Sequence, residues 1–215
     1  MNPEDLARRR IEYETAGLER SDLADDPVAQ WWRWYREASA AGVTEPNAMV
    51  VATVDAEGRP DARIVLVREV DERGFTFYSN HGSPKGAQIT ATGVASLTFG
   101  WLQLHRQVRV RGTAHTFSDA EADAYWASRP RDSQLASAAS PQSQVIADRA
   151  ELERRIADQA SQWADLAAVP RPAHWGGFRV APSAFEFWQG RPARTHDRFR
   201  YRRSGTVWVV ERLAP

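Results

Sequence analysis

The sequence predicts a single domain of mainly antiparallel β structure with peripheral helices, and three observations support this fold class. Runs rich in Val, Ile, Phe and Tyr recur along the chain, and short turns that contain glycine separate many of them. Short turns join antiparallel neighbours, because parallel strands need a long crossover. A length of 215 residues is enough for one domain, 1–215, with a sizeable core. Several short strands in hairpin order suggest a small barrel that closes its own edges.

The composition excludes several classes of protein. Cysteine is absent, which removes disulfides, thiolate nucleophiles and cysteine metal sites. The formal net charge is zero, so we expect neither nucleic acid nor a membrane as a partner. The charged N-terminus has no signal-like apolar segment and no run reaches the roughly 18 apolar residues of a membrane helix, so we expect a cytoplasmic protein. The scattered histidines predict no metal site.

The N-terminal segment, residues 1–42, is expected to be helical. A short charged helix is predicted over 4–16. A second helix, over 27–41, is marked by Asp26 as a cap and by Gly42 at its C-terminal end. Its apolar residues recur at helical spacing, which predicts one face packed on the core.

The remaining elements follow in order. Alternating and β-branched segments predict strands at 48–55, 61–70, 75–80, 94–102, 106–117, 177–188, 197–203 and 206–212. Helices are expected over 83–92, over 118–128 and from Asp148 onward. Ser83 is a natural cap for the first helix, while Ser118 and Glu121 form a capping box for the second. The stretch 134–144, rich in Ser, Ala and Gln, indicates a mobile loop.

The residues that carry chemistry are cations and hydroxyls. Glycine-rich phosphate loops, the HExxH metal motif and the GxSxG nucleophile motif are all missing from the sequence. Three polar groups lie beside predicted strand ends instead. The first contains Arg63 and Arg68, predicted on opposite faces of one strand, with Ser79, Ser83 and Lys85; the second contains Arg129, Arg131 and Ser133; the third contains Arg194, His196 and Arg198. A helix N-terminus beside a cation favours phosphate, so the groups together predict small anionic ligands.

These segments also resemble a known family. The matching stretches are NAMVVATVD (47–55), RIVLV (63–67), GFTFYSN (74–80), RQVRVRG (106–112), SRPRDSQ (128–134), WGGFRV (175–180), EFWQGR (186–191), RTHDR (194–198) and ERLAP (211–215). Over nearly its whole length the chain is similar to the pyridoxamine 5′-phosphate oxidase family. The resemblance implies an antiparallel split β-barrel, a homodimer and FMN bound at the subunit interface.

The resemblance also implies which residues would bind FMN. The strand from Arg63 to Arg68 would lie along the flavin and its phosphate arm, and Gln107 would bond the flavin ring. Residues from the later part of the chain would close on the flavin from the partner subunit. The implied set is Arg63, Ile64, Val65, Leu66, Val67, Arg68, Tyr78, Ser79, Pro84, Lys85, Gln107, Gln142, Ser143, Trp188 and Arg198.

A second implied set would bind the substrate, a phosphorylated pyridine. Arg68, Tyr125, Arg129 and Ser133 would meet its phosphate, Arg194 and His196 would lie against its ring as the catalytic residues, and Arg10 and Tyr13 would belong to an N-terminal segment that covers it. The implied reaction is oxidation of pyridoxamine or pyridoxine 5′-phosphate to pyridoxal 5′-phosphate. Hydride would pass to flavin N5, and oxygen would reoxidise the flavin to give hydrogen peroxide.

Four features depart from the family pattern and keep alternatives open. Pro84 stands where an Arg is usual, Arg68 where a Lys is usual, and Thr195 where an apolar residue is usual. The segment ASAAS (136–140) replaces one that usually contains Gly and Trp. One alternative is an FMN-dependent oxidase of a phenazine-type intermediate on the same scaffold. Others are a non-catalytic flavin- or haem-binding module and a deazaflavin-dependent reductase.

Overall fold

The computed structural model describes Tyr13 and residues 15–215, which form two compact units. Unit 1 takes in Met1–Met49, Leu97–Arg111 and Ser183–Pro215; unit 2 takes in Val50–Ser96 and Gly112–Pro182. Four strands, β1 (Ala48–Val54), β5 (Val94–Trp101), β6 (Arg106–Thr116) and β7 (Trp175–Gln189), have residues in both units. Because four strands have residues in both units, this division does not test the predicted single domain, 1–215. The single domain stays a prediction.

The strands make an antiparallel sheet, as predicted. Besides the shared strands, unit 2 contains β2 (Pro60–Leu66), β3 (Glu69–Asp71) and β4 (Gly74–Asn80), and unit 1 contains β8 (Asp197–Ser204) and β9 (Val207–Leu213). Hydrogen-bonded neighbours run β2-β1-β5-β6-β7-β4-β3, with β8 on β7 and β9 on β8. In unit 2, β4 pairs antiparallel with β7 from Phe75↔Val180 to Asn80↔Trp175. In unit 1, β7 pairs antiparallel with β8 from Ala184↔Arg202 to Gln189↔Asp197.

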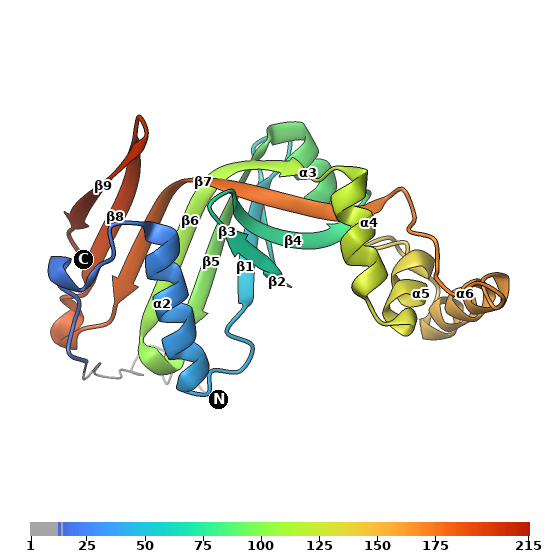
Figure 1. The fold of residues 1–215 in the computed structure, drawn as a ribbon, viewed down its shortest axis with the longest axis horizontal. Coiled ribbons are helices and arrows are strands. Elements are labelled where there is room, and N and C mark those ends of the chain that lie inside the picture. Colours follow the sequence, from blue (N-terminus) through green and yellow to red (C-terminus); the bar gives the residue numbers. More distant parts are fainter. Residues whose placement is uncertain (1–12, 14) are drawn as a thin grey trace. The chain divides into compact units, whose positions relative to one another are not determined.

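Unit 1 carries the helix that the sequence marks best. Helix α2 (Pro27–Ala40) begins at the Asp26 cap, whose side chain accepts from the Ala29 N–H. Trp31 and Trp34 are both buried, and the Trp31 ring packs edge-on against Phe99 of β5 at 5.2 Å. Figure 1 shows this helix alongside β5 and β6. The unit also contains three short 3₁₀ helices: η1 (Arg20–Asp22), η2 (Leu102–Leu104) and η3 (Pro192–Arg194).

Among the described residues, unit 2 carries the other α-helices, which are α3 (Pro84–Thr92), α4 (Asp119–Ser128), α5 (Arg131–Ala139) and α6 (Arg149–Gln162). Trp126 of α4, Leu135 of α5 and Trp175 of β7 form one buried cluster, against which Ile156 of α6 packs. The last three helices therefore lie together at one end of this unit (Figure 1). No helix within the described residues is both long and apolar enough to span a membrane.

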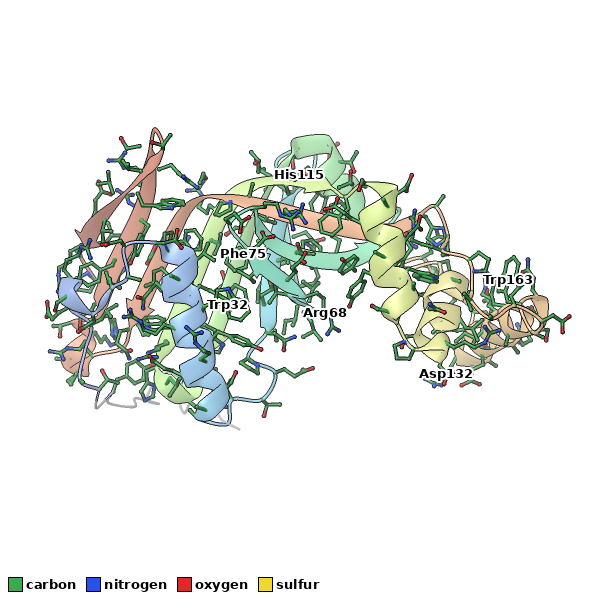
Figure 2. All side chains as sticks on the ribbon, in the orientation of Figure 1. Trp32, Arg68, Phe75, His115, Asp132 and Trp163 are labelled. Carbon is green, nitrogen blue, oxygen red and sulfur yellow. The ribbon has the colours of Figure 1, made fainter. Side chains whose placement is uncertain are left out.

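The strand predicted over 61–70 is wrong in one respect, because it is two strands. β2 ends at Leu66 and β3 begins at Glu69. Between them the Arg68 N–H donates to the Thr76 carbonyl of β4 at 2.8 Å. Arg63 and Arg68 therefore do not share a strand, and Arg68 lies exposed in the break between β2 and β3 (Figure 2).

The loop predicted over 134–144 is also wrong, because α5 occupies 131–139. Ala, Leu and Gln all favour a helix, and two of these side chains have buried partners. Leu135 joins the tryptophan cluster, and the Gln134 side-chain amide donates to the Trp126 carbonyl at 2.7 Å. Burial of one face thus decides the conformation of this segment, and only the part after Ser140 is irregular.

Other boundaries shift by a few residues. The strand predicted over 177–188 spans 175–189, and the long polar helix ends at Gln162 although its pattern continues to 168. The helix predicted over 4–16 lies largely outside the described residues, and Tyr13, Thr15 and Ala16 are not helical.

Removing the cap of α4 should destabilise the fold measurably. Ser118 accepts from the Glu121 N–H, and the Glu121 carboxylate accepts from the Ser118 N–H and Oγ. Ser118→Ala should therefore lower the free energy of unfolding by about 1 kcal/mol, measured by chemical denaturation. Ser39→Ala is the matched control, because Ser39 donates to Tyr35 within a helix and caps nothing. Equal stability of the two variants would contradict the capping role.

Candidate active site

A polar cavity opens in unit 2 where β2, β4 and the start of α3 meet. Its volume is about 440 Å³, and its lining residues are Asp61, Ala62, Arg63, Ile64, Val65, Tyr78, Ser79, Pro84, Lys85, Gln142 and Ser143. Nine of the residues predicted to bind FMN therefore line one cavity. Of the other predicted FMN residues in unit 2, Leu66, Val67 and Arg68 follow at the end of β2 and beyond it.

Lys85 is the central cation of this cavity. Ser83 caps α3 by accepting from the Gly86 N–H, which places Lys85 in the first turn of the helix. Its side chain is only 9% exposed, and its ammonium donates to the Oγ of Ser79 at 3.2 Å, the Oγ of Ser83 at 3.3 Å and the Oε1 of Gln142 at 3.0 Å. Burial lowers the pKa of Lys85, and the nearby Arg63 lowers it further.

These contacts give Lys85 only neutral oxygens. Within the described part of the chain, no carboxylate lies at ion-pair distance from its ammonium. A buried charge without a counter-ion is costly. The first-turn N–H groups of α3 add to the local positive potential. The cavity thus has the electrostatics of an anion site, and a phosphate fits it.

Arg63 is the second cation, and its neighbours hold it in place. Its guanidinium donates to the Val51 carbonyl at 3.1 Å and to the Thr53 hydroxyl at 2.6 Å, and it pairs with Asp61. Sequence reasoning missed Thr53 and Asp61. The available signal was the alternation of β1, which places Thr53 on the buried face.

Gln142 and Ser143 reach the cavity from the segment after α5. Gln142 Oε1 accepts from Ser79 at 3.0 Å as well as from Lys85. Ser143 lies in the left-handed region at φ 69°. The family resemblance implies that both residues come from the partner subunit, whereas Gln142 contacts Lys85 of its own chain.

An aromatic stack stands beside the cavity. The rings of Tyr78 and Tyr125 stack at 3.6 Å, and Trp175 stacks on Tyr78 at 5.4 Å. Burial raises the pKa of Tyr78 to about 12, so its hydroxyl stays protonated as a hydrogen-bond donor at neutral pH.

Arg129 lies against the same aromatic group with part of its hydrogen-bonding capacity unused. Its guanidinium packs over the rings of Trp126 and Trp175, and its Nη2 donates to Ser137 Oγ at 2.9 Å. Its Nη1 is buried and has no hydrogen-bond partner in the described part of the chain. Burial lowers the pKa of Arg129; Tyr125 opposes this and Arg68 adds to it. Tyr125 and Arg129 both contact the Trp175 ring, and Arg68 lies near enough to act on Arg129 electrostatically.

Arg131 and Ser133, which the sequence groups with Arg129, differ in where their side chains lie. Ser133 lies partly buried on α5, in the same unit. Arg131 donates instead to the carbonyls of Trp163 and Leu166, so its side chain is used to hold the end of α6.

Unit 1 brings together a second set of predicted residues. The Tyr13 ring stacks on His105 at 4.1 Å and lies 6.2 Å from Trp188 and 5.9 Å from His196. Trp188 and His196 are themselves 4.6 Å apart. His105 was not predicted, and its φ of 50° at the end of η2 is visible only in the structure. Arg10 lies outside the described residues.

The ring nitrogens of His196 are distinguished by one hydrogen bond. The Arg191 N–H donates to His196 Nδ1 at 3.1 Å, so the neutral ring carries its proton on Nε2. Burial and the neighbouring Arg194 lower the pKa of His196, which favours this neutral form, while Asp197 opposes the shift. Arg194 is exposed and, like Ala193 before it, has a positive φ.

The remaining predicted residues of unit 1 lie on its strands. Arg198 donates to Glu186 at 2.9 Å and to the Ala214 carbonyl at 2.8 Å, opposite Trp188 in the sheet register. Gln107 is half-buried on β6. No group of acidic and histidine residues that could hold a metal ion occurs among the described residues.

Comparison with known proteins decides the family. A family model described as pyridoxamine 5′-phosphate oxidase matches residues 35–163, which is more than half of the chain. The chain belongs to the pyridoxamine 5′-phosphate oxidase family. A second model, described as the pyridoxine 5′-phosphate oxidase C-terminal dimerisation region, matches residues 175–215.

Relatives of this family cover the whole chain. A pyridoxine/pyridoxamine 5′-phosphate oxidase of Burkholderia vietnamiensis is 50% identical over 98% of this chain and 99% of its own length. One of Synechocystis is 49% identical over 98% of each. Among solved structures, PhzG of Burkholderia lata 383, in complex with tetrahydrophenazine-1-carboxylic acid, has a TM-score of 0.86 at 33% identity and covers 94% of this chain and 98% of its own.

A more distant structure supports the fold alone. A pyridoxamine 5′-phosphate oxidase-related, FMN-binding protein of Nostoc punctiforme has a TM-score of 0.70 at 17% identity, over 90% of this chain and 100% of its own. These findings confirm the predicted antiparallel split barrel and the predicted enzyme class, an oxidase like pyridoxamine 5′-phosphate oxidase. A flavin cofactor follows from the family, and the C-terminal match shows that the chain carries the family's dimerisation region.

Proposed function

We propose that this chain oxidises pyridoxamine 5′-phosphate and pyridoxine 5′-phosphate to pyridoxal 5′-phosphate, with FMN as cofactor and oxygen as acceptor. The observation that carries the substrate is Arg129, whose buried Nη1 has no hydrogen-bond partner among the residues that the structure describes. A buried guanidinium N–H is expensive to leave unpaired, and a phosphate oxygen satisfies it well. Arg68 supplies a second cation close by.

The cavity around Lys85 supports FMN. Lys85, Ser79 and Ser83 offer a cation and two hydroxyls near the start of α3. A phosphate monoester would pair with the Lys85 ammonium, which now bonds these neutral hydroxyl oxygens. Arg63 brings a second positive charge to the cavity wall. We infer that these residues hold the FMN phosphate, and that the other predicted cofactor residues hold the ribityl chain and the ring.

The chemistry requires placement more than proton transfer. When bound, FMN would accept a hydride from the C4′ carbon of the substrate and pass the electrons to oxygen, giving hydrogen peroxide. Arg194 and His196 would orient the pyridine ring, with neutral His196 presenting its Nε2 proton to a ring acceptor. With the amine substrate, water would hydrolyse the resulting imine to the aldehyde and ammonia.

PhzG provides the observation that favours a second candidate. That protein was solved with a tetrahydrophenazine carboxylic acid, and its backbone matches this chain closely. Small residues at 136–140 border a cavity of about 270 Å³ beside Trp175, which offers room for a different ring system. The second candidate is therefore FMN-dependent oxidation of a phenazine precursor, for which the phosphate-binding arginines would not be needed.

One assay distinguishes the two candidates. The protein, loaded with FMN in air, is given pyridoxamine 5′-phosphate, unphosphorylated pyridoxamine or a tetrahydrophenazine carboxylic acid, and aldehyde absorbance and peroxide are followed. The proposal expects turnover of the phosphorylated pyridine, with a much lower kcat/KM for its unphosphorylated analogue. Faster turnover of the phenazine precursor would support the second candidate.

We also propose that the enzyme is a homodimer whose flavin site is completed by both chains. Trp188 and Arg198 do not line the Lys85 cavity of their own chain, and both lie within residues 175–215, which match the family's dimerisation region; this match supports the assembly. Analytical ultracentrifugation at low micromolar concentration should show a dimer that retains flavin. A stable monomer that keeps its flavin on dilution would contradict the shared site.

A further inference from the structure

A buried carboxylate, Asp197, lies at the first position of β8 and immediately after His196. Its residue is only 8% exposed, and both of its oxygens are used. Oδ1 accepts from Arg212 Nη1 at 2.7 Å, and Oδ2 accepts from the backbone N–H of Leu18 at 2.9 Å. The Nε of Arg191 lies 3.6 Å from Oδ2. One side chain thus joins the N-terminal segment, β9 and the loop before β8.

Arg191 extends this connection in two directions. Its side chain pairs with Asp197 and donates to the Ala16 carbonyl at 3.1 Å, while its backbone N–H donates to His196 Nδ1. The guanidinium crosses Gly17 so closely that a Cβ there would lie 2.3 Å from Nη1. Gly17 has a φ of +85°, a conformation that favours glycine, whereas the end of the Arg191 side chain could shift to admit a Cβ.

The loop closed by these contacts contains Arg194. Ala193 and Arg194 are consecutive non-glycine residues with φ of 52° and 60°. Such a conformation is strained and persists only where neighbouring contacts fix it. The Arg191–Asp197 pair and the Arg191–His196 hydrogen bond fix both ends of this loop.

The same contacts seat the segment that carries Tyr13. Thr15 donates to the Gly190 carbonyl, Ala16 accepts from Arg191, and Leu18 donates to Asp197. Tyr13, next to this segment, contacts His105, Trp188 and His196. The N-terminal segment and the Arg194–His196 loop are therefore anchored to one carboxylate.

We propose that Asp197 is a positioning residue for the oxidase site, which fixes the orientation of His196 through Arg191 and docks residues 15–18 beside it. An exposed ion pair contributes little, because solvent screens it and side-chain entropy opposes it. Asp197 differs because it is buried and shares its two oxygens among a backbone N–H and two guanidinium groups. Asparagine cannot replace it. Its single side-chain oxygen can accept from only one of the two sides, Leu18 or Arg212, and its NH₂ group would face a donor on the other.

The decisive test compares Asp197→Asn with Glu211→Gln. Glu211 is a matched control, because it pairs with Arg200 and Arg202 across β8 and β9 without contacting residues 15–18 or 191–196. Two structural readouts need no activity: hydrogen exchange of the Leu18 amide, and the ring ¹⁵N shifts of His196, which report its tautomer. In Asp197→Asn, exchange at Leu18 should rise at least about tenfold and the preference for the Nε2 proton should weaken; Glu211→Gln should change neither.

The effect on catalysis rests on the proposed function and is measured separately. Asp197→Asn should lower kcat/KM for pyridoxamine 5′-phosphate about tenfold, mostly through KM, with flavin content unchanged. Arg191→Gln is a second variant for the case in which Asp197→Asn folds poorly. It breaks the Arg191–Asp197 pair and the contact with the Ala16 carbonyl but leaves Asp197 bonded to Arg212 and Leu18, so its readout is the His196 tautomer. Unchanged Leu18 exchange and an unchanged His196 tautomer in a folded variant would overturn the proposal. If the structural readouts change but neither the native protein nor the variants oxidise pyridoxamine 5′-phosphate, the proposed function fails and the positioning role stands.

Discussion

Lys85→Ala should leave the purified enzyme without bound FMN. The ammonium of Lys85 is the buried cation of the 440 Å³ cavity, and among the described residues its hydrogen-bond acceptors are all neutral oxygens. A charged hydrogen bond to phosphate contributes about 1.5–3 kcal/mol, so affinity should fall roughly ten- to a hundredfold. Flavin absorbance after purification and fluorescence titration of the apoenzyme with FMN measure the loss.

Three further variants sharpen this test. Lys85→Arg should bind FMN more weakly than the native chain, because a planar guanidinium does not fit where a compact ammonium does. Pro84→Arg should bind it more tightly, since it places a second cation beside the phosphate. Arg149→Ala removes an exposed cation that pairs with Glu153 on the same helix and should bind FMN normally. Unchanged FMN affinity in Lys85→Ala would show that this cavity does not hold the phosphate.

Local signals in the sequence predict much of the fold. Helix α2 follows from Asp26 and the spacing of its tryptophans, and α4 follows from Ser118 and Glu121, because caps act over three or four residues. The break at Arg68 could not be predicted in this way. It depends on a hydrogen bond to Thr76 of another strand, while the apolar pattern of 61–70 runs through it.

Long-range packing explains why α5 was missed. The composition of 134–144 is typical of loops, and the helix depends on burial of Leu135 beside Trp126 and Trp175. The site shows the same contrast between local signals and long-range contacts. The sequence places Ser83 and Lys85 at a helix start, whereas the contact of Lys85 with Gln142 joins residues 57 positions apart. Contacts at such separation carry no local pattern.

Arg129→Ala should weaken substrate binding far more than cofactor binding. Arg129 packs on aromatic rings, near Arg68 and Tyr125, and its buried Nη1 has no partner within Tyr13 and residues 15–215, so a ligand can supply one. Losing a charged hydrogen bond to the substrate phosphate should raise KM roughly ten- to a hundredfold, while FMN affinity changes little. Steady-state kinetics with pyridoxamine 5′-phosphate and a parallel FMN titration measure the two effects.

The control for this variant separates the loss of the phosphate contact from the loss of packing. Arg129 also fills space against Trp126 and Trp175, so its removal disturbs the helical end of unit 2. Arg129→Lys keeps a positive charge and most of the aliphatic stem but lacks the planar guanidinium that can bind a phosphate with two N–H groups. Its KM should therefore lie between those of the native enzyme and Arg129→Ala. Unphosphorylated pyridoxamine gives the sharper comparison, because its kcat/KM should be nearly the same in the native enzyme and in Arg129→Ala. An equal fall for both substrates, or a fall in FMN affinity that matches the rise in KM, would assign Arg129 to the flavin or to the fold and leave the substrate phosphate without its proposed partner.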